Sequence, residues 1–120
     1  MIQIEQFIFN PFQENTFLLH DNRQCIIIDP GCYHTNEKEE LIDFIRTKQL
    51  EPILLINTHC HLDHIFGNAH VLNHFKIPFY CHKAEEPVLL AAPMVAERYG
   101  LYCSESPAPS RFIEAGETIS

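Results

Sequence analysis

A continuous apolar run, Pro52 to Asn57, leads directly into the heptapeptide Thr58-His59-Cys60-His61-Leu62-Asp63-His64. A short unbroken apolar run is typical of a strand that is buried on both faces, as in the middle of an α/β sheet. The heptapeptide therefore lies just past the carboxyl end of a central strand, where open α/β sheets place their functional sites. This junction constrains both the fold class and the position of the site.

The heptapeptide alternates polar metal-ligand types with residues that lean apolar. In extended backbone, alternate side chains point the same way, so His59, His61 and Asp63 project to one side while Cys60 and Leu62 project to the other. The pattern predicts a cluster of ligands above a buried thiol and leucine. The alternative is a histidine-rich surface loop or hydrogen-bonded core histidines, which is the reading we adopt for the isolated His20, His34, His70 and His74.

His64 joins the cluster only if the chain changes direction. Apolar residues at helical spacing after Asp63 predict a helix over residues 65–76, and its first turn can bring His64 to the same side. Two metals then fit the ligands better than one. Imidazole with carboxylate suits Zn²⁺ first, with Fe or Mn also possible.

These residues resemble a known family. The stretch at residues 58–64 is similar to the His-x-His-x-Asp-His signature of the metallo-β-lactamase superfamily, and its continuation Ile65-Phe66-Gly67-Asn68 is closest to the glyoxalase II-like branch. Residues 15–19 and 25–31, the latter ending in Asp-Pro-Gly, resemble the family's opening strands. The resemblance runs through residues 78–82 to residues 114–117 and covers about half of the family's fold.

The resemblance implies a ligand set. His59 and His61 correspond to ligands of a first metal, and Asp63 and His64 to ligands of a second, with a further His, a bridging Asp and a final His expected downstream. In such a site a hydroxide held by two metals attacks an ester, thioester or lactam carbonyl, and Asp63 also orients this nucleophile. Glyoxalase II-like thioester hydrolysis is the first function that the resemblance implies, for a small-molecule thioester or ester substrate.

Two further residues correspond to supporting positions of the family. Asp29 matches a carboxylate that holds the ligand loop from behind without touching metal. Its simpler role would be that of a turn former before Pro30-Gly31. Gly67 matches a position where a helix start packs closely on its neighbours, the alternative being a chance glycine that costs about 1 kcal/mol in a helix.

The implied fold is the N-terminal βα half of a four-layer αββα sandwich, formed by residues 1–120, with the C-terminal half outside this chain. Such a half exposes an apolar sheet face and an edge strand, both of which favour association. We therefore expect a partner: the chain's own C-terminal half or a second copy. The competing interpretation is a non-catalytic, truncated metal-binding or assembly module that associates through its open sheet.

Composition narrows the partners and the compartment. A formal net charge of -8 disfavours nucleic acid and anionic membrane surfaces, since both require basic patches. The five cysteines are odd in number and show no C-x-x-C spacing, which is typical of reduced thiols. No signal peptide or transmembrane segment is recognisable in the sequence. These features predict a cytoplasmic protein.

The remaining elements follow from patterning. We expect strands at residues 2–9, 16–20, 25–29 and 79–81, and a loop at residues 104–110. Asn36 with Glu39 three residues later predicts a capping box and a helix start. Residues 83–99 predict a helix that breaks near Pro93, since proline interrupts the hydrogen-bond ladder. His82 is expected to lie beside this helix's N-cap or, alternatively, to line the cleft.

Overall fold

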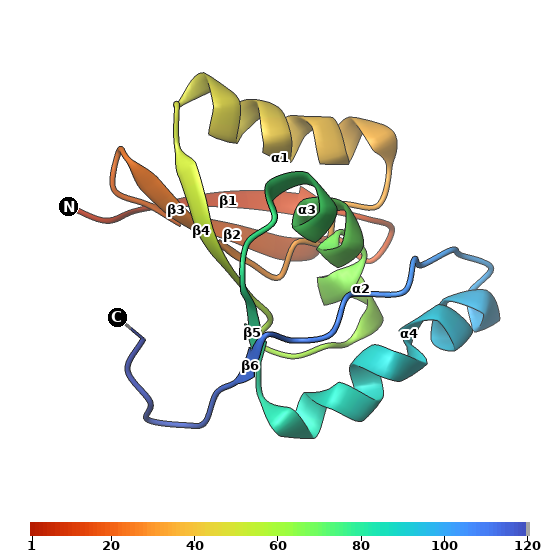
Figure 1. Cartoon of the computed structure of the whole chain (residues 1–120). Helices are drawn as coiled ribbons and strands as arrows, with labels where there is room; N and C mark the ends of the chain where they lie inside the picture. Colours follow the sequence, from red (N-terminus) through yellow and green to blue (C-terminus); the bar gives the residue numbers. More distant parts are fainter. Residues whose placement is uncertain (120) are drawn as a thin grey trace.

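The computed structural model describes residues 1–119, and the strands in this range form one mixed sheet (Figure 1). Its strands lie in chain order: β1 (Gln3–Phe9), β2 (Glu14–His20), β3 (Gln24–Ile28), β4 (Glu51–Ile56), β5 (Phe79–Cys81) and β6 (Arg111–Phe112). The first three are antiparallel neighbours, whereas β3 to β6 pair in parallel. The predicted strands are confirmed to within two residues. The short strand β6 was not predicted and follows the expected proline-containing loop.

Helices connect the parallel strands. They are α1 (Thr35–Thr47), α2 (Leu62–Ile65), α3 (Asn68–Phe75) and α4 (Glu86–Arg98), with the 3-10 turn η1 (Lys83–Glu85) before α4. The helix expected over residues 65–76 is observed as α3, which begins at Asn68. A separate short helix, α2, precedes it, and the chain turns at Phe66-Gly67 between the two. Within residues 1–119, no helix combines the length and the apolar character needed to cross a bilayer.

Two expectations about the helices were wrong: the position of the capping box of α1 and the break of α4 near Pro93. The capping box of α1 is formed by His34 and Glu37, not by Asn36 and Glu39. Glu37 takes this position because its Oε1 also accepts the backbone N–H groups of Tyr33 and His34, which satisfies the chain entering the helix. The helix α4 also continues through Pro93. Its buried side chains lie on both sides of the proline, and packing of this kind outweighs the lost ladder bond.

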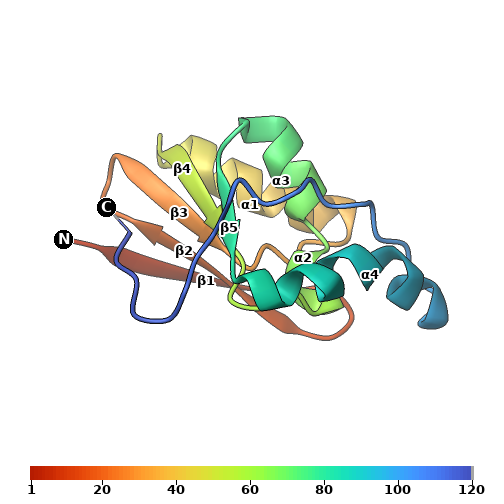
Figure 2. The same ribbon diagram turned by 60° about the horizontal axis from the view of Figure 1, so that its bottom comes forward.

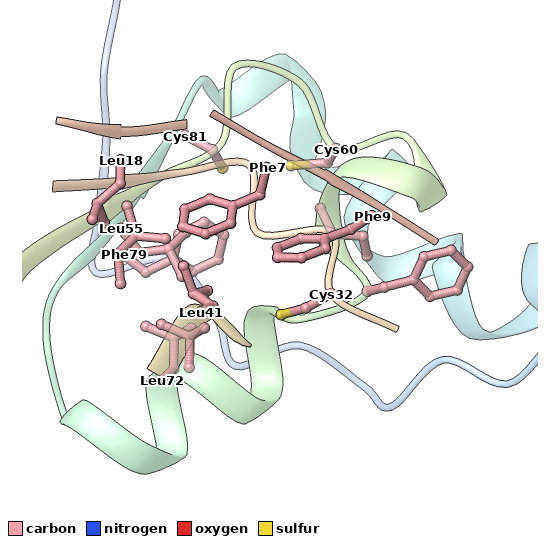
Figure 3. Packing of buried hydrophobic residues seen from close by; sticks show 14 of the residues in the cluster. Phe7, Phe9, Leu18, Cys32, Leu41, Leu55, Cys60, Leu72, Phe79 and Cys81 are labelled. Atoms are coloured by element: carbon pink, nitrogen blue, oxygen red, sulfur yellow. The ribbon is translucent and has the colours of Figure 1, made fainter. Parts of the chain in front are cut away.

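Helices α1 and α3 cover one face of the sheet, as Figure 1 shows, and the hydrophobic core lies between them and the strands (Figure 3). The core includes Phe9 and Leu55 from the sheet, Leu41 from α1 and Val71 from α3, all at most 1% exposed. Helix α4 runs along the end of the sheet where the ligand loop lies and packs against α2 (Figure 2).

The opposite face of the sheet carries exposed apolar side chains. On β1, Ile4 is 67% and Ile8 64% exposed, and on β4 Ile53 is 38% exposed. Ile4 is level with Leu19 of β2, which is level with Ile26 of β3, so an apolar row crosses the strands. The mixed α/β architecture with this open face agrees with the predicted fold class.

Candidate metal centre

The heptapeptide forms the loop between β4 and α2 and the start of α2. Cys60 is fully buried and Leu62 is 8% exposed, while His59, His61 and Asp63 are only partly buried or exposed. The alternation predicted from extended backbone is therefore present. It ends at α2, whose first turn holds Asp63 at a helix N-terminus, where a carboxylate is favoured.

The structure brings the four predicted ligand residues side by side. The ring centroids of His59 and His61 are 4.8 Å apart, and those of His59 and His64 are 3.8 Å apart. His64 Nε2 lies 3.5 Å from Asp63 Oδ2. The first turn of α2 brings His64 back towards His59, as expected for a helix that starts inside the motif. This convergence agrees with a shared site, and the assignment of each residue as a metal ligand stays a prediction.

Asp29 lies directly behind the loop at the end of β3. It is 3% exposed, its Oδ1 accepts the backbone N–H of Thr58 at 2.7 Å, and its Oδ2 accepts the Thr58 hydroxyl. Asp29 Oδ2 also lies 3.1 Å from His64 Nδ1. These contacts agree with the supporting position expected for this carboxylate. Its φ of 52° is left-handed, so Asp29 also serves the turn before Pro30.

Asp29 is also a candidate metal ligand. One donor atom each from Asp29, His59 and His64 lie within 4.8 Å of one another, which is close enough for small side-chain rotations to bring them onto one ion. Two imidazoles and a carboxylate suit a divalent first-row metal. The residues present therefore fit a metal.

Glu14, at the start of β2, is a site residue that the sequence interpretation missed. Its side chain is buried beneath the cluster, and burial raises its pKa to about 8 in spite of the Thr16 hydrogen bond and the nearby His64. The sequence held a signal for it. Every second residue of β2 faces inward, and Glu14 lies two residues before the inward-facing Thr16. The strand expected at residues 16–20 begins two residues after Glu14 and so left it out.

The environment of His64 also changes its proton affinity. Burial by itself lowers the pKa of the imidazole, but the carboxyl groups of Asp29, Asp63 and Glu14 outweigh burial, so the pKa of His64 is raised. A metal ligand must present a neutral nitrogen, so a metal bound here would compete with a proton at this residue.

Glu85, the last residue of η1, holds the loop from the other side. Its Oε1 accepts the backbone N–H of Cys60 at 2.7 Å. No local sequence pattern predicts this contact, because 25 residues separate the partners. His82 was expected beside the N-cap and is itself the N-cap residue of η1: its Nδ1 accepts the N–H of Ala84 at 3.0 Å.

Gly67 makes the close approach that was expected of it. Its N–H donates to Pro30 O at 2.8 Å, and an added Cβ would lie 2.7 Å from that same oxygen and closer still to Cys32 Sγ. Gly31 is equally confined, since a Cβ there would collide with the Glu14 carboxyl group and with the Asp63 carbonyl. Both glycines thus allow the Asp-Pro-Gly turn to lie against the ligand residues.

A groove of about 360 Å³ opens beside His61 and Asp63. Its other walls are apolar and come from the β1–β2 turn, α2 and α4; the lining residues are Phe12, Leu62, Val88, Ala92, Val95 and Tyr99. Phe12 and Tyr99 meet edge to face with ring centroids 5.3 Å apart. This volume is at the lower end of the range for small-molecule pockets.

Comparison with known proteins agrees with this geometry. Residues 9–114 match the family model described as the metallo-beta-lactamase superfamily. The chain is 34% identical over 84 residues to the probable metallo-hydrolase YqgX of Bacillus subtilis, an alignment that covers 70% of this chain and 38% of that protein. It is 31% identical over 121 aligned positions to the hydroxyacylglutathione hydrolase GloC of Haemophilus influenzae, covering 98% of this chain and 55% of GloC.

Two solved structures resemble the whole chain. The crystal structure of TTHA1623 in a di-iron-bound form has a TM-score of 0.84 at 28% identity and covers 96% of this chain and 56% of that one. The structure of the BLEG-1 B3 metallo-beta-lactamase has a TM-score of 0.83 at 26% identity, covering 98% and 56%. The chain thus spans about half the length, or less, of these relatives.

Proposed function

We propose that the chain, which belongs to the metallo-beta-lactamase superfamily, is the N-terminal, metal-binding half of a hydrolase. The observation that carries this proposal is the convergence of His59, His61, Asp63 and His64 in front of the buried Asp29. The substrate class we propose is a small-molecule thioester or ester, in the manner of glyoxalase II. The relative named hydroxyacylglutathione hydrolase GloC supports this choice.

We assign His59 and His61 to a first metal and Asp63 and His64 to a second. Zn²⁺ is the first candidate from the donor types, and the di-iron form of TTHA1623 supports iron as the alternative. When bound, such metals lower the pKa of water towards 7 and polarise a carbonyl group.

The protein's own residues position the reactants. The Asp63 carboxylate at the N-terminus of α2 accepts a hydrogen bond from the attacking water and orients it towards the substrate. The apolar groove beside His61 receives an uncharged part of the substrate, because its other walls offer aromatic and aliphatic surface. Asp29 keeps the loop in place through Thr58 while substrate binds.

We propose that the chain's own C-terminal half packs on the open face of the sheet. Exposed Ile4, Ile8 and Ile53 carry this step, since burial of apolar surface is worth about 25 cal/mol per Å². A second copy of the chain is the alternative cover, and it belongs to the second candidate function, a non-catalytic metal-binding or assembly module. The five free cysteines, all buried, support a reducing, cytoplasmic location.

The test is hydrolysis of a hydroxyacylglutathione by the complete protein, with His61→Ala and Asp63→Ala as site variants and His74→Ala as the matched control on the exposed surface of α3. We expect both site variants to lose activity and zinc, and the control to retain both. The isolated 120-residue chain, titrated with zinc by calorimetry, should bind weakly and show little turnover, because it supplies two ligands per metal where a catalytic zinc has about three. Full activity of the two site variants would refute the proposal, and a complete protein that binds metal without any hydrolysis would favour the assembly module.

A further inference from the structure

We propose that Glu14 is a positioning residue for His64: its buried Oε2 accepts the Nδ1–H of His64 together with Asp29 and so directs His64 Nε2 towards the metal. This inference rests on the proposed function, because that function makes His64 a ligand. It goes beyond it by giving a role to a carboxyl group outside the ligand motif.

The first observation is a pair of unsatisfied atoms. Glu14 Oε2 and His64 Nδ1 are both buried without a well-formed hydrogen bond, and they lie 3.5 Å apart. An unpaired buried polar group destabilises the folded protein. Native structures rarely leave such groups unpaired, so a small rotation that joins these two atoms removes two penalties at once.

The second observation is that the other oxygen of Glu14 is anchored. Oε1 lies 2.7 Å from Thr16 Oγ1, which also lies 2.9 Å from the Asp29 carbonyl oxygen and accepts the Gly31 N–H at 3.0 Å. A hydroxyl group has one proton to donate and two lone pairs. Thr16 is within donor distance of both Glu14 Oε1 and the Asp29 carbonyl oxygen, so Oε1 is held as an acceptor at Thr16 and Oε2 is left to face His64.

The third step concerns geometry at His64. With Oε1 tied to Thr16, Oε2 of Glu14 faces Nδ1, and Asp29 Oδ2 approaches the same nitrogen from 3.1 Å. Two oxygens at Nδ1 keep its proton there, which leaves Nε2 as the lone-pair nitrogen. Nε2 is the atom that lies 3.5 Å from Asp63 Oδ2, where the second metal is proposed. Oε2 accepts a hydrogen bond in the neutral and the ionised acid alike, so this role does not require Glu14 to titrate.

The same contacts give the Glu14 carboxyl group a role that an apolar side chain at this position would not fill. Glu14 connects His64 to Thr16, and Thr16 holds both the carbonyl of Asp29 and the N–H of Gly31. The Asp-Pro-Gly turn and the ligand His64 are therefore fixed to each other through one side chain. Partners of this kind typically contribute 10–100-fold to metal affinity.

The experiment compares Glu14→Gln with Glu14→Met in the 120-residue chain. Glutamine keeps an oxygen that accepts from His64, while its amide NH₂ donates to Thr16, whose own proton then goes to the Asp29 carbonyl. Methionine fills the same space without polar atoms. The imidazole ¹⁵N shifts of His64, read by NMR in the metal-free protein at alkaline pH, report the tautomer directly. Zn²⁺ affinity is the second readout.

We expect one Nδ1–H tautomer in the wild type and in Glu14→Gln, and a mixture of tautomers with about 10–100-fold weaker Zn²⁺ binding in Glu14→Met. An unchanged tautomer and unchanged affinity in Glu14→Met would overturn the proposal, as would equal losses in both variants. Because the tautomer is measured without metal, the Glu14–His64 contact is decided even if the isolated chain binds no zinc, and the proposed function is tested separately in the complete protein. If Glu14→Met does not fold, Thr16→Val tests the same anchor, and retention of a single tautomer there would also overturn the inference.

Discussion

Gly67→Ala tests the close approach on which the ligand site is built. The added methyl group meets Pro30 O at 2.7 Å and Cys32 Sγ at a shorter distance, and the Pro30 oxygen is a backbone atom that cannot turn aside as the end of a flexible side chain can. Pro30 also follows Asp29 directly, so a shift of this turn is transmitted to the carboxylate behind the ligand loop.

The expected size of the effect follows from opposing contributions. Overpacking typically costs about 1–3 kcal/mol, and separating the two segments also stretches the Gly67 N–H to Pro30 O bond, worth about 0.5–1.5 kcal/mol. Alanine restricts the unfolded chain and thereby returns about 0.4–1 kcal/mol. The sum is a loss near 2 kcal/mol in the free energy of unfolding, or about 30-fold in the folded-to-unfolded ratio.

Urea unfolding of the wild type, Gly67→Ala, Cys32→Ala and the double variant measures this loss and assigns it. Removing the Cys32 sulfur relieves the nearer of the two collisions, so we expect a favourable coupling of about 0.5–1 kcal/mol between the two substitutions. Zn²⁺ affinity should fall in Gly67→Ala as Asp29 moves. A Gly67→Ala protein as stable as the wild type, with unchanged metal affinity, would show that the neighbours yield freely and would refute the reasoning.

Three further predictions concern the loop, the pH dependence and the open face. Glu85→Ala removes the acceptor of the Cys60 N–H and should weaken Zn²⁺ binding by roughly 10-fold, whereas Glu85→Gln should retain most of it, as measured by calorimetry. The pKa of Glu14 is raised from 4.5 in the unfolded chain to about 8 in the folded protein. Between these pH values the unfolded chain has released the proton that the folded protein still holds, so the metal-free protein loses stability as the pH rises. Glu14→Gln should reduce this dependence of the unfolding free energy on pH, as measured by urea titrations across the range. Ile4→Asp with Ile8→Asp should weaken association through the sheet by about 100-fold or more in sedimentation experiments, at about 1.5 kcal/mol or more per buried isoleucine, and unchanged association would exclude this face as the interface.

Much of the site could be predicted because it depends on local backbone rules. Extended backbone fixes which residues of the heptapeptide face together, and the helix that starts at Leu62 fixes where His64 turns. Cys60 is buried as the alternation requires. The placement of His59 and His61 side by side therefore followed from the sequence with few assumptions about the rest of the fold.

The residues that escaped prediction act over long sequence separations. Glu85 reaches the loop only because β5 places η1 beside it. A sequence pattern that spans a few residues cannot predict such a contact. Glu14 was hidden for another reason: a buried carboxyl group is costly unless paired, so a glutamate next to a turn is normally read as exposed. The helix through Pro93 likewise shows tertiary packing overriding a local preference.

The contacts of the loop explain how its shape can precede metal binding. Two carboxyl groups from different elements accept backbone N–H groups on either side of His59: Asp29 takes the N–H of Thr58, and Glu85 takes that of Cys60. Hydrogen bonds to charged acceptors are stronger than neutral ones, at about 1.5–3 kcal/mol each. With the buried Cys60 side chain as a third restraint, the backbone that carries His59 is held by the protein alone. A site held in this way does not have to order its loop when metal binds, so more of the metal's coordination energy appears as affinity.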